Sequence, residues 1–278
     1  MSALLEVNDL RVSFDTPRGP FHAVRGVSFA LGRERLGIVG ESGSGKSLTG
    51  RSILRLLPPS ASLQAERLTF DGVDLLRASP RVLRGIRGAR ISLVLQDPKY
   101  SLNPVMTVGE QIDEAGRIHL GLNAVAARRK TLEMLQAVRI RDPERVVRLH
   151  PHEVSGGMGQ RIMIAMMLVP EPDLLIADEP TSALDVTVQM QVLAILDDLV
   201  TRRGMGLIFI SHDLDLVASF CDRVLVMYAG RVVEERSAGE LASATHPYTQ
   251  GLLRSLPRIG EVRAELPVLD RDAAWLEG

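Results

Sequence analysis

Residues 40–47 read Gly40-Glu41-Ser42-Gly43-Ser44-Gly45-Lys46-Ser47 and satisfy the phosphate-loop pattern G-x-x-x-x-G-K-[ST]. In such a loop, backbone N–H groups wrap phosphates and the positive end of the following helix dipole adds to their attraction. Lys46 is placed to reach the outer phosphates, and the Ser47 hydroxyl is placed to ligate magnesium. A chance match in a chain of this composition is expected about once in a hundred cases. The segment therefore predicts a nucleotide site.

The residues on either side of the loop support this interpretation. Arg35–Val39 is a short apolar run typical of a buried strand, and 47–57 resumes at helical spacing until Pro58 and Pro59. A strand, a glycine-rich turn and a helix in this order form the unit in which phosphate loops occur.

Further apolar runs predict the rest of the sheet. Residues 4–14 and 21–31 alternate apolar and polar side chains around turn residues, which predicts an antiparallel pair of strands. Four more runs are typical of buried strands, several of them followed by helical segments: 91–95, 174–177, 207–210 and 224–227. Between Thr107 and His150 the spacing is helical, without a convincing strand. We therefore predict an α/β fold with a mostly parallel sheet, an N-terminal antiparallel β subdomain and an inserted α-helical subdomain.

Composition limits the classes of function. The chain has 278 residues, 45% of them hydrophobic, so it can bury a full core. Its formal net charge of -1 argues against nucleic acid as the main partner. A single cysteine, Cys221, fits a reducing compartment. No export signal is visible in 1–14, and the longest apolar stretch, 162–170, is far below the roughly 20 residues of a membrane-spanning helix. We expect a cytoplasmic protein whose membrane role, if any, is peripheral.

Two carboxylates end the apolar run 174–177. Asp178 is placed to hold magnesium, usually through water, and Glu179 to polarise the water that attacks the γ-phosphate. An acidic pair at a strand end is more often a solvated turn. The phosphate loop upstream is what favours the catalytic interpretation.

A second glycine-rich segment precedes that strand and opens a helix: Ser155-Gly156-Gly157-Met158-Gly159-Gln160-Arg161. In isolation it would be taken as a helix cap. Beside the phosphate loop and the acidic pair, the chain resembles the ATP-binding cassette superfamily, whose signature motif has this S-G-G-x-x-Q form. The resemblance implies a P-loop ATPase core and a second anion site that is offered to the γ-phosphate of ATP on an opposite subunit. Its residues would be Ser155, Gly156, Gly157 and Gln160.

Other family motifs occur in the expected order. Phe14 matches the aromatic residue that stacks on adenine, and Gln96 matches the glutamine that senses magnesium. Asp185 ends the segment Ser182-Ala183-Leu184-Asp185, which matches the loop that crosses the dimer interface. His212 matches the histidine that contacts the γ-phosphate and orients the attacking water. Taken singly, Phe14 is equally a strand core residue, Gln96 a surface residue and His212 a loop or cap residue.

The resemblance therefore implies ATP and Mg²⁺ as ligands. Its catalytic residues would be Glu179, His212 and Gln96, and its magnesium site would comprise Ser47, Gln96 and Asp178.

Longer segments narrow the resemblance to the ATPase subunits of the dipeptide, oligopeptide and nickel importers: 96–104, 151–153 and His246-Pro247-Tyr248-Thr249 with Leu252-Leu253. The likeness extends to about Gly260. It implies an ATPase domain over 1–260, a helical subdomain inserted over about 97–156, and a short tail over 261–278, which is either a strap or disordered.

This narrower resemblance also implies partners and a location. The chain would be a peripheral subunit on the cytoplasmic face of the bacterial inner membrane. It would work with a second ATPase subunit, identical or paralogous, two transmembrane permease subunits and an extracytoplasmic solute-binding protein, and not with nucleic acid.

Two departures and two alternatives accompany the resemblance. No cysteine follows Cys221, so we expect no iron-sulfur cluster of the kind that many of these ATPases carry. Gly159 stands where arginine is common, which leaves open a weakened signature half-site. The alternatives are a soluble cassette ATPase that acts on ribosomes or DNA, and a weakly active subunit that binds ATP and regulates a partner. The sequence shows neither the tandem cassettes nor the coiled-coil insertions typical of the first.

Overall fold

The computed structural model describes residues 3–182, 184–255 and 275. The chain forms two compact units. The first combines Met1–Ala78 with Ile208–Gly278, and the second is Ser79–Leu207. The predicted tail over 261–278 lies outside the described residues apart from Trp275.

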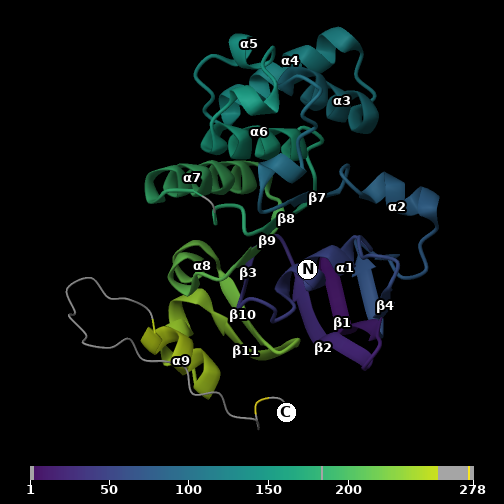
Figure 1. Ribbon diagram of the computed structural model, residues 1–278, viewed down its shortest axis with the longest axis vertical. Helices are drawn as coiled ribbons and strands as arrows, with labels where there is room; N and C mark the ends of the chain where they lie inside the picture. The colour runs from purple at the N-terminus through teal and green to yellow at the C-terminus, as the bar shows by residue number, and fades with distance from the viewer. Residues whose placement is uncertain (1–2, 183, 256–274, 276–278) are drawn as a thin grey trace. The chain divides into compact units, whose positions relative to one another are not determined.

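An antiparallel sheet opens the first unit. Strands β1 (Leu5–Thr16) and β2 (Gly19–Leu31) form its long hairpin, seen in purple in Figure 1, and confirm the predicted antiparallel pair. Three short strands complete the sheet: β4 (Ala61–Gln64), β5 (Arg67–Phe70) and β6 (Val73–Asp74). The strand order is β2-β1-β5-β6, and β4 also pairs with β1. Leu5 and Val7, and after a register shift Leu10 and Val12, are buried at alternate positions of β1, because side chains of a strand point to opposite faces. The three short strands are absent from the sequence prediction.

The second sheet of this unit carries the phosphate loop. Strand β3 (Arg35–Val39) runs parallel to β10 (Arg223–Tyr228), and β11 (Arg231–Ser237) is antiparallel to β10. Strand β9 (Gly206–Ser211), which begins in the second unit, follows β3 in the strand order. The helices of the unit are α1 (Lys46–Ile53), α8 (Leu214–Phe220) and α9 (Pro247–Ser255), preceded by a 3-10 helix over Ala238–Ser243.

The end predicted for the helix after the phosphate loop was wrong. Helix α1 stops at Ile53, four residues before the predicted end. Arg55 adopts a φ of 51°, and the Leu56 N–H donates to the Arg51 carbonyl at 2.9 Å. This left-handed residue closes the helix before the prolines are reached.

The second unit is mostly helical. Strands β7 (Ile91–Val94) and β8 (Leu174–Asp178), both predicted as buried strands, form a parallel pair. The helices are α2 (Pro80–Ile86), α3 (Val108–Leu120), α4 (Ala124–Ala137), α5 (Pro143–Val146), α6 (Gly156–Leu168) and α7 (Val186–Arg203), with 3-10 turns over Pro98–Tyr100 and Pro151–Glu153. Figure 1 shows α3, α4 and α5 gathered beside α6.

Local capping explains where the helices of the predicted insert begin. Thr107 and Glu110 form a reciprocal capping box at α3, and Asn123 caps α4 by accepting from the Ala126 N–H. Between these helices, Asp113 accepts hydrogen bonds from Arg128 at 2.7 Å and from Thr131 at 2.6 Å. Within the described ranges, none of the helices is long and apolar enough to cross a membrane.

Candidate nucleotide-binding site

The phosphate loop joins β3 to α1 in the first unit, and its glycines have steric reasons. Gly40 and Gly45 have φ values of 151° and 98°. A Cβ on Gly40 would lie 2.1 Å from the carbonyl oxygen of Met227, where no side chain fits. Gly43, with φ 82°, has nothing within 4 Å of its Cβ position, so there the constraint is the backbone conformation alone. The loop therefore has the tight backbone that phosphate binding requires.

Lys46 is buried within its own loop. The Nζ atom donates to the Gly40 carbonyl at 2.7 Å and to the Glu41 carbonyl at 2.8 Å, and it lies 3.5 Å from Ser44 Oγ. Only 5% of the residue is exposed, so these acceptors stabilise a charge that has lost its water. Lys46 thus lies at the N-terminus of α1, and Ser47 follows it in the first helical turn.

Two other predicted residues lie in the first unit. Phe14 is half-buried on β1 and pairs across the hairpin with Phe21, whose side chain is 60% exposed. His212 is exposed directly after β9, and its neighbour Asp213 caps α8 by accepting from the Leu216 N–H at 3.0 Å. The partly exposed aromatic pair and the exposed imidazole are both accessible to a ligand.

The acidic pair ends β8 in the second unit. Asp178 is 4% exposed, and Glu179 is half-buried with a φ of 49°. A non-glycine residue in this left-handed region costs on the order of 1 kcal/mol and is typical of functional sites. The Glu179 carbonyl accepts from the N–H and the hydroxyl of Ser182, at 3.4 and 3.3 Å. These two hydrogen bonds form a turn that supports the left-handed conformation of Glu179.

The two signature glycines have different environments. Ser155 caps α6 by accepting from the Met158 N–H at 3.3 Å, and it remains exposed. A Cβ on Gly157 would lie 2.7 Å from Val188 Cγ1, so this glycine allows α6 and α7 to pack closely. A Cβ on Gly156 would meet nothing within 4 Å. Packing therefore explains Gly157, whereas Gly156 leaves the helix N-terminus open to an approaching anion.

One cavity brings the Gln96 segment and the signature segment together. It has a volume of about 240 Å³, and its lining includes Gln96, Pro98, Ser155, Gly156, Gly159 and Gln160. Gln160 is 1% exposed, and its Nε2 has no hydrogen-bond partner among the described residues. A buried amide nitrogen in that state requires water or a ligand. At Gly159, a Cβ would contact Pro98 at an ordinary 3.5 Å, so the missing side chain enlarges the cavity.

Asp185 has a structural role in this chain. Its carboxylate caps α7 by accepting from the Val188 N–H at 3.0 Å. Ala183, in the predicted interface loop, lies outside the described residues.

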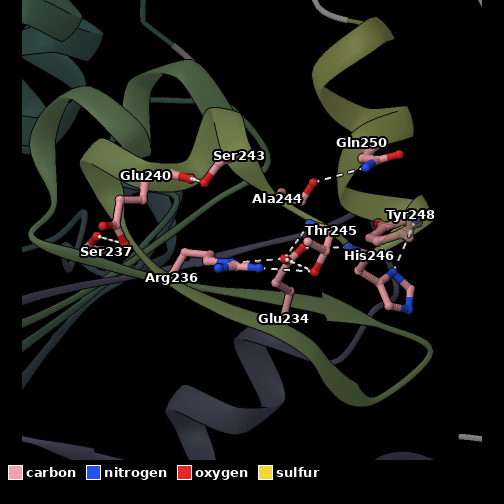
Figure 2. A network of polar contacts seen from close by, with 10 residues as sticks. All are labelled: Glu234, Arg236, Ser237, Glu240, Ser243, Ala244, Thr245, His246, Tyr248 and Gln250. Atoms are coloured by element: carbon pink, nitrogen blue, oxygen red, sulfur yellow. Dashed lines mark hydrogen bonds and ion pairs between the residues drawn. The ribbon is translucent and has the colours of Figure 1, made fainter.

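A pKa shift identifies a cluster that the sequence analysis did not assign, shown in Figure 2. Burial alone would raise the pKa of Glu234 on β11. Hydrogen bonds from the Thr245 backbone, the Arg236 side chain and the His246 backbone outweigh the effect of burial and lower this pKa to about 2. This carboxylate holds the start of α9. The sequence analysis used the segment from His246 to Thr249 as part of the family resemblance, but it assigned these residues no role.

Cys221 is buried, as the sequence predicts. Burial, with Asp222 nearby, raises the pKa of its thiol to about 12, so the residue is an unreactive apolar side chain at neutral pH.

Comparisons with known proteins agree with this geometry. Residues 24–182 match the ABC transporter family. The chain is 52% identical to a probable peptide ABC transporter ATP-binding protein, y4tR of Sinorhizobium fredii, over 91% of this chain and 77% of that protein. It is 49% identical to the dipeptide transport ATP-binding protein DppD of Bacillus subtilis, over 97% and 82%.

A solved structure supports the same assignment. A dimeric structure of a bacterial ABC transporter cassette superposes with a TM-score of 0.75 at 25% identity, covering 84% of this chain and 98% of the other. The resemblance predicted from the motifs is confirmed, and so is the α/β cassette fold. From the phosphate loop, the signature segment and these matches together, we conclude that this chain belongs to the ABC transporter family and carries its ATP-binding domain.

Proposed function

We propose that the chain is the ATP-hydrolysing subunit of a bacterial importer for peptides. The observation that carries this proposal is the likeness, over nearly the whole chain, to ATP-binding proteins named for peptide and dipeptide transport. Cassette ATPases that act on ribosomes or DNA are the alternative, and the names of these relatives favour the importer. Nickel and related small solutes remain the second candidate cargo, on the sequence segments shared with nickel importers.

Within one chain, the first unit binds the nucleotide phosphates. Ser42, Gly43 and Gly45 present backbone to them, and Lys46 exchanges its carbonyl acceptors for phosphate oxygens. Phe14 stacks on the adenine. The partial exposure of Phe14 and the exposure of Ser42 and Gly43 support these roles.

The magnesium ligands we propose are Ser47, Asp178 and Gln96, all of which offer oxygen atoms. Such a donor set suits Mg²⁺, which prefers hard oxygen ligands and retains water molecules. When bound, the ion neutralises charge on the β- and γ-phosphates. Glu179 accepts a proton from the attacking water as general base, and His212 orients that water and contacts the γ-phosphate.

The signature segment serves a second ATPase subunit, identical or paralogous. Ser155, Gly156, Gly157 and Gln160 contact the ATP held by the partner, and Asp185 lies at the interface between the two subunits. The open N-terminus of α6 supports this proposal. Closing of the pair around ATP, and reopening after hydrolysis, would drive two permease subunits that receive cargo from an extracytoplasmic solute-binding protein. The chain would then be peripheral on the cytoplasmic face of the inner membrane.

The test is purification of the tagged full chain from detergent-solubilised membranes of its own organism, followed by mass spectrometry of the proteins that accompany it. We expect two multi-spanning proteins and a second cassette ATPase. Reconstitution of this complex with its solute-binding protein should then support ATP-dependent uptake of a labelled dipeptide. Recovery of ribosomal or DNA-repair proteins instead of permeases would overturn the importer, and uptake of nickel without peptide would overturn the cargo.

A further inference from the structure

The C-terminal helix of the described chain contacts the phosphate loop. Tyr248, in the first turn of α9, is fully buried, and its hydroxyl accepts a hydrogen bond from the Glu41 N–H at 3.0 Å. The two residues are 207 positions apart in sequence. This contact brings a tyrosine from outside the nucleotide motifs to the first peptide of the loop.

The peptide that Tyr248 contacts is the same one that Lys46 contacts. It joins Gly40 to Glu41: its carbonyl oxygen accepts from Lys46 Nζ at 2.7 Å, and its N–H donates to Tyr248 Oη at 3.0 Å. A peptide group is planar, so its N–H and C=O rotate together. The loop backbone is therefore fixed on both sides of one rigid plane.

Tyr248 is itself held firmly. The carboxylate of Glu234 accepts from the Thr245 N–H at 2.8 Å, from the His246 N–H at 3.3 Å and from Arg236 Nε at 3.1 Å. Figure 2 shows this carboxylate at the start of α9, beside the first helical turn that carries Tyr248. The Tyr248 N–H donates to His246 Nδ1 at 3.2 Å. These bonds fix the first turn of the helix, and with it the tyrosine.

The rings around Tyr248 complete its support. Its ring centroid lies 4.6 Å from that of Tyr228, at the end of β10, and 6.1 Å from that of Trp275. The same strand end supports the loop, because the Gly230 N–H in the β10–β11 turn donates to the Ser44 carbonyl at 3.0 Å. The phosphate loop and α9 thus share one scaffold, the β10–β11 hairpin.

We propose that Tyr248 is a positioning residue for the phosphate loop, which keeps the Gly40–Glu41 peptide in its orientation when Lys46 turns to the phosphates of ATP. This inference rests on the proposed function of Lys46. Without nucleotide, both Lys46 and Tyr248 hold the peptide. Once the ammonium binds phosphate, the Gly40 carbonyl loses that donor and the tyrosine hydroxyl carries the restraint.

The variant Tyr248→Phe tests this role, because it retains the ring and its packing and removes only the hydroxyl. We expect the Kd for ATP of the full chain, and the KM for ATP of the tagged complex, to rise about 5- to 10-fold, as loss of one hydrogen bond implies. We expect kcat to stay within about twofold, because no reacting atom is touched. The thermal midpoint without nucleotide should fall by no more than about 2 °C, and the rise of that midpoint on adding ATP should shrink.

Tyr228→Phe is the matched control. It removes a hydroxyl from the same aromatic cluster, and among the described residues that hydroxyl makes no hydrogen bond to the loop. Its Kd and KM for ATP should equal those of the wild type. Equal ATP affinities in all three proteins would overturn the positioning role while leaving the ATPase intact. A fall in kcat and thermal midpoint with unchanged KM would also overturn it, since that pattern indicates structural support alone. Failure of the wild-type chain to bind ATP would contradict the proposed function, and that result is obtained without any variant.

Discussion

Replacement of Gly156 by alanine should separate stability from activity, because the two signature glycines exist for different reasons. The Cβ of Gly156→Ala meets nothing within 4 Å, and the residue opens α6 in a helical conformation. Alanine loses less conformational entropy than glycine on entering a helix, which stabilises by about 0.5 kcal/mol at a terminal position. The thermal midpoint should therefore rise by about 1–2 °C.

The same methyl group should impair hydrolysis. In the proposed function, it occupies the space through which a phosphate oxygen of the partner's ATP would approach the backbone N–H groups of α6 to about 3 Å. Losing one such preorganised contact costs about 1.4–2.8 kcal/mol in the transition state, so we expect ATP turnover to fall about 10- to 100-fold.

The assay combines thermal unfolding of the purified full chain with steady-state ATP hydrolysis by the complex. Gly157→Ala is the comparison: its Cβ lies 2.7 Å from Val188 Cγ1 and should destabilise by about 1–3 kcal/mol, with activity falling alongside. A Gly156→Ala protein that is less stable than the wild type, or equally stable and fully active, would refute the assignment of this position to ligand approach.

Two further predictions follow from capping and charge. Glu234 has its pKa lowered from 4.5 to about 2, so its contribution is fully present above pH 4.5 and is lost as the pH falls toward 2. Glu234→Gln should lower the free energy of unfolding at pH 7 by no more than about 3 kcal/mol, and it should flatten the loss of stability between pH 4.5 and pH 2. Urea unfolding at a series of pH values measures both effects. A pH profile of stability equal to that of the wild type would contradict the lowered pKa of Glu234. Asp185→Ala should cost about 1 kcal/mol by loss of the α7 cap, and Asp185→Asn, which caps equally well, should restore stability. Full hydrolysis by the Asn variant would contradict a role for this carboxylate at the dimer interface.

The parts of the fold that follow from local sequence were predictable. The phosphate loop, the capped start of α6 and the buried strands each have a signal within about ten residues, because glycine, capping side chains and apolar runs act on nearby backbone. Strands β3, β7, β8 and β10 followed from these runs, and their parallel direction followed from the α/β class, but the sequence did not predict which of them pair.

Other features depend on distant contacts. The early end of α1 at Ile53 arises from a left-handed Arg55, for which the sequence has no glycine signal. The difference between Gly156 and Gly157 appears only when α7 is in place, since Val188 is what crowds one of them. The contact of Tyr248 with Glu41 joins segments that are 207 residues apart, and no local sequence pattern predicts such a hydrogen bond. An aspartate directly before a helical segment is a typical helix cap, so the capping role of Asp185 was predictable. The family motif indicated only a role at the dimer interface.

The proposed role of Glu179 as general base in ATP hydrolysis is tested by a comparison of the wild type with Glu179→Gln. Both would be tagged, purified as the membrane complex, and assayed for equilibrium ATP binding and single-turnover hydrolysis at the site that contains the substitution. Glutamine has the size of glutamate and can adopt the same left-handed backbone conformation at position 179, but its amide does not accept the proton of the attacking water. We expect ATP binding equal to that of the wild type and hydrolysis at least about 100-fold slower. Hydrolysis at the wild-type rate by the variant would contradict this role.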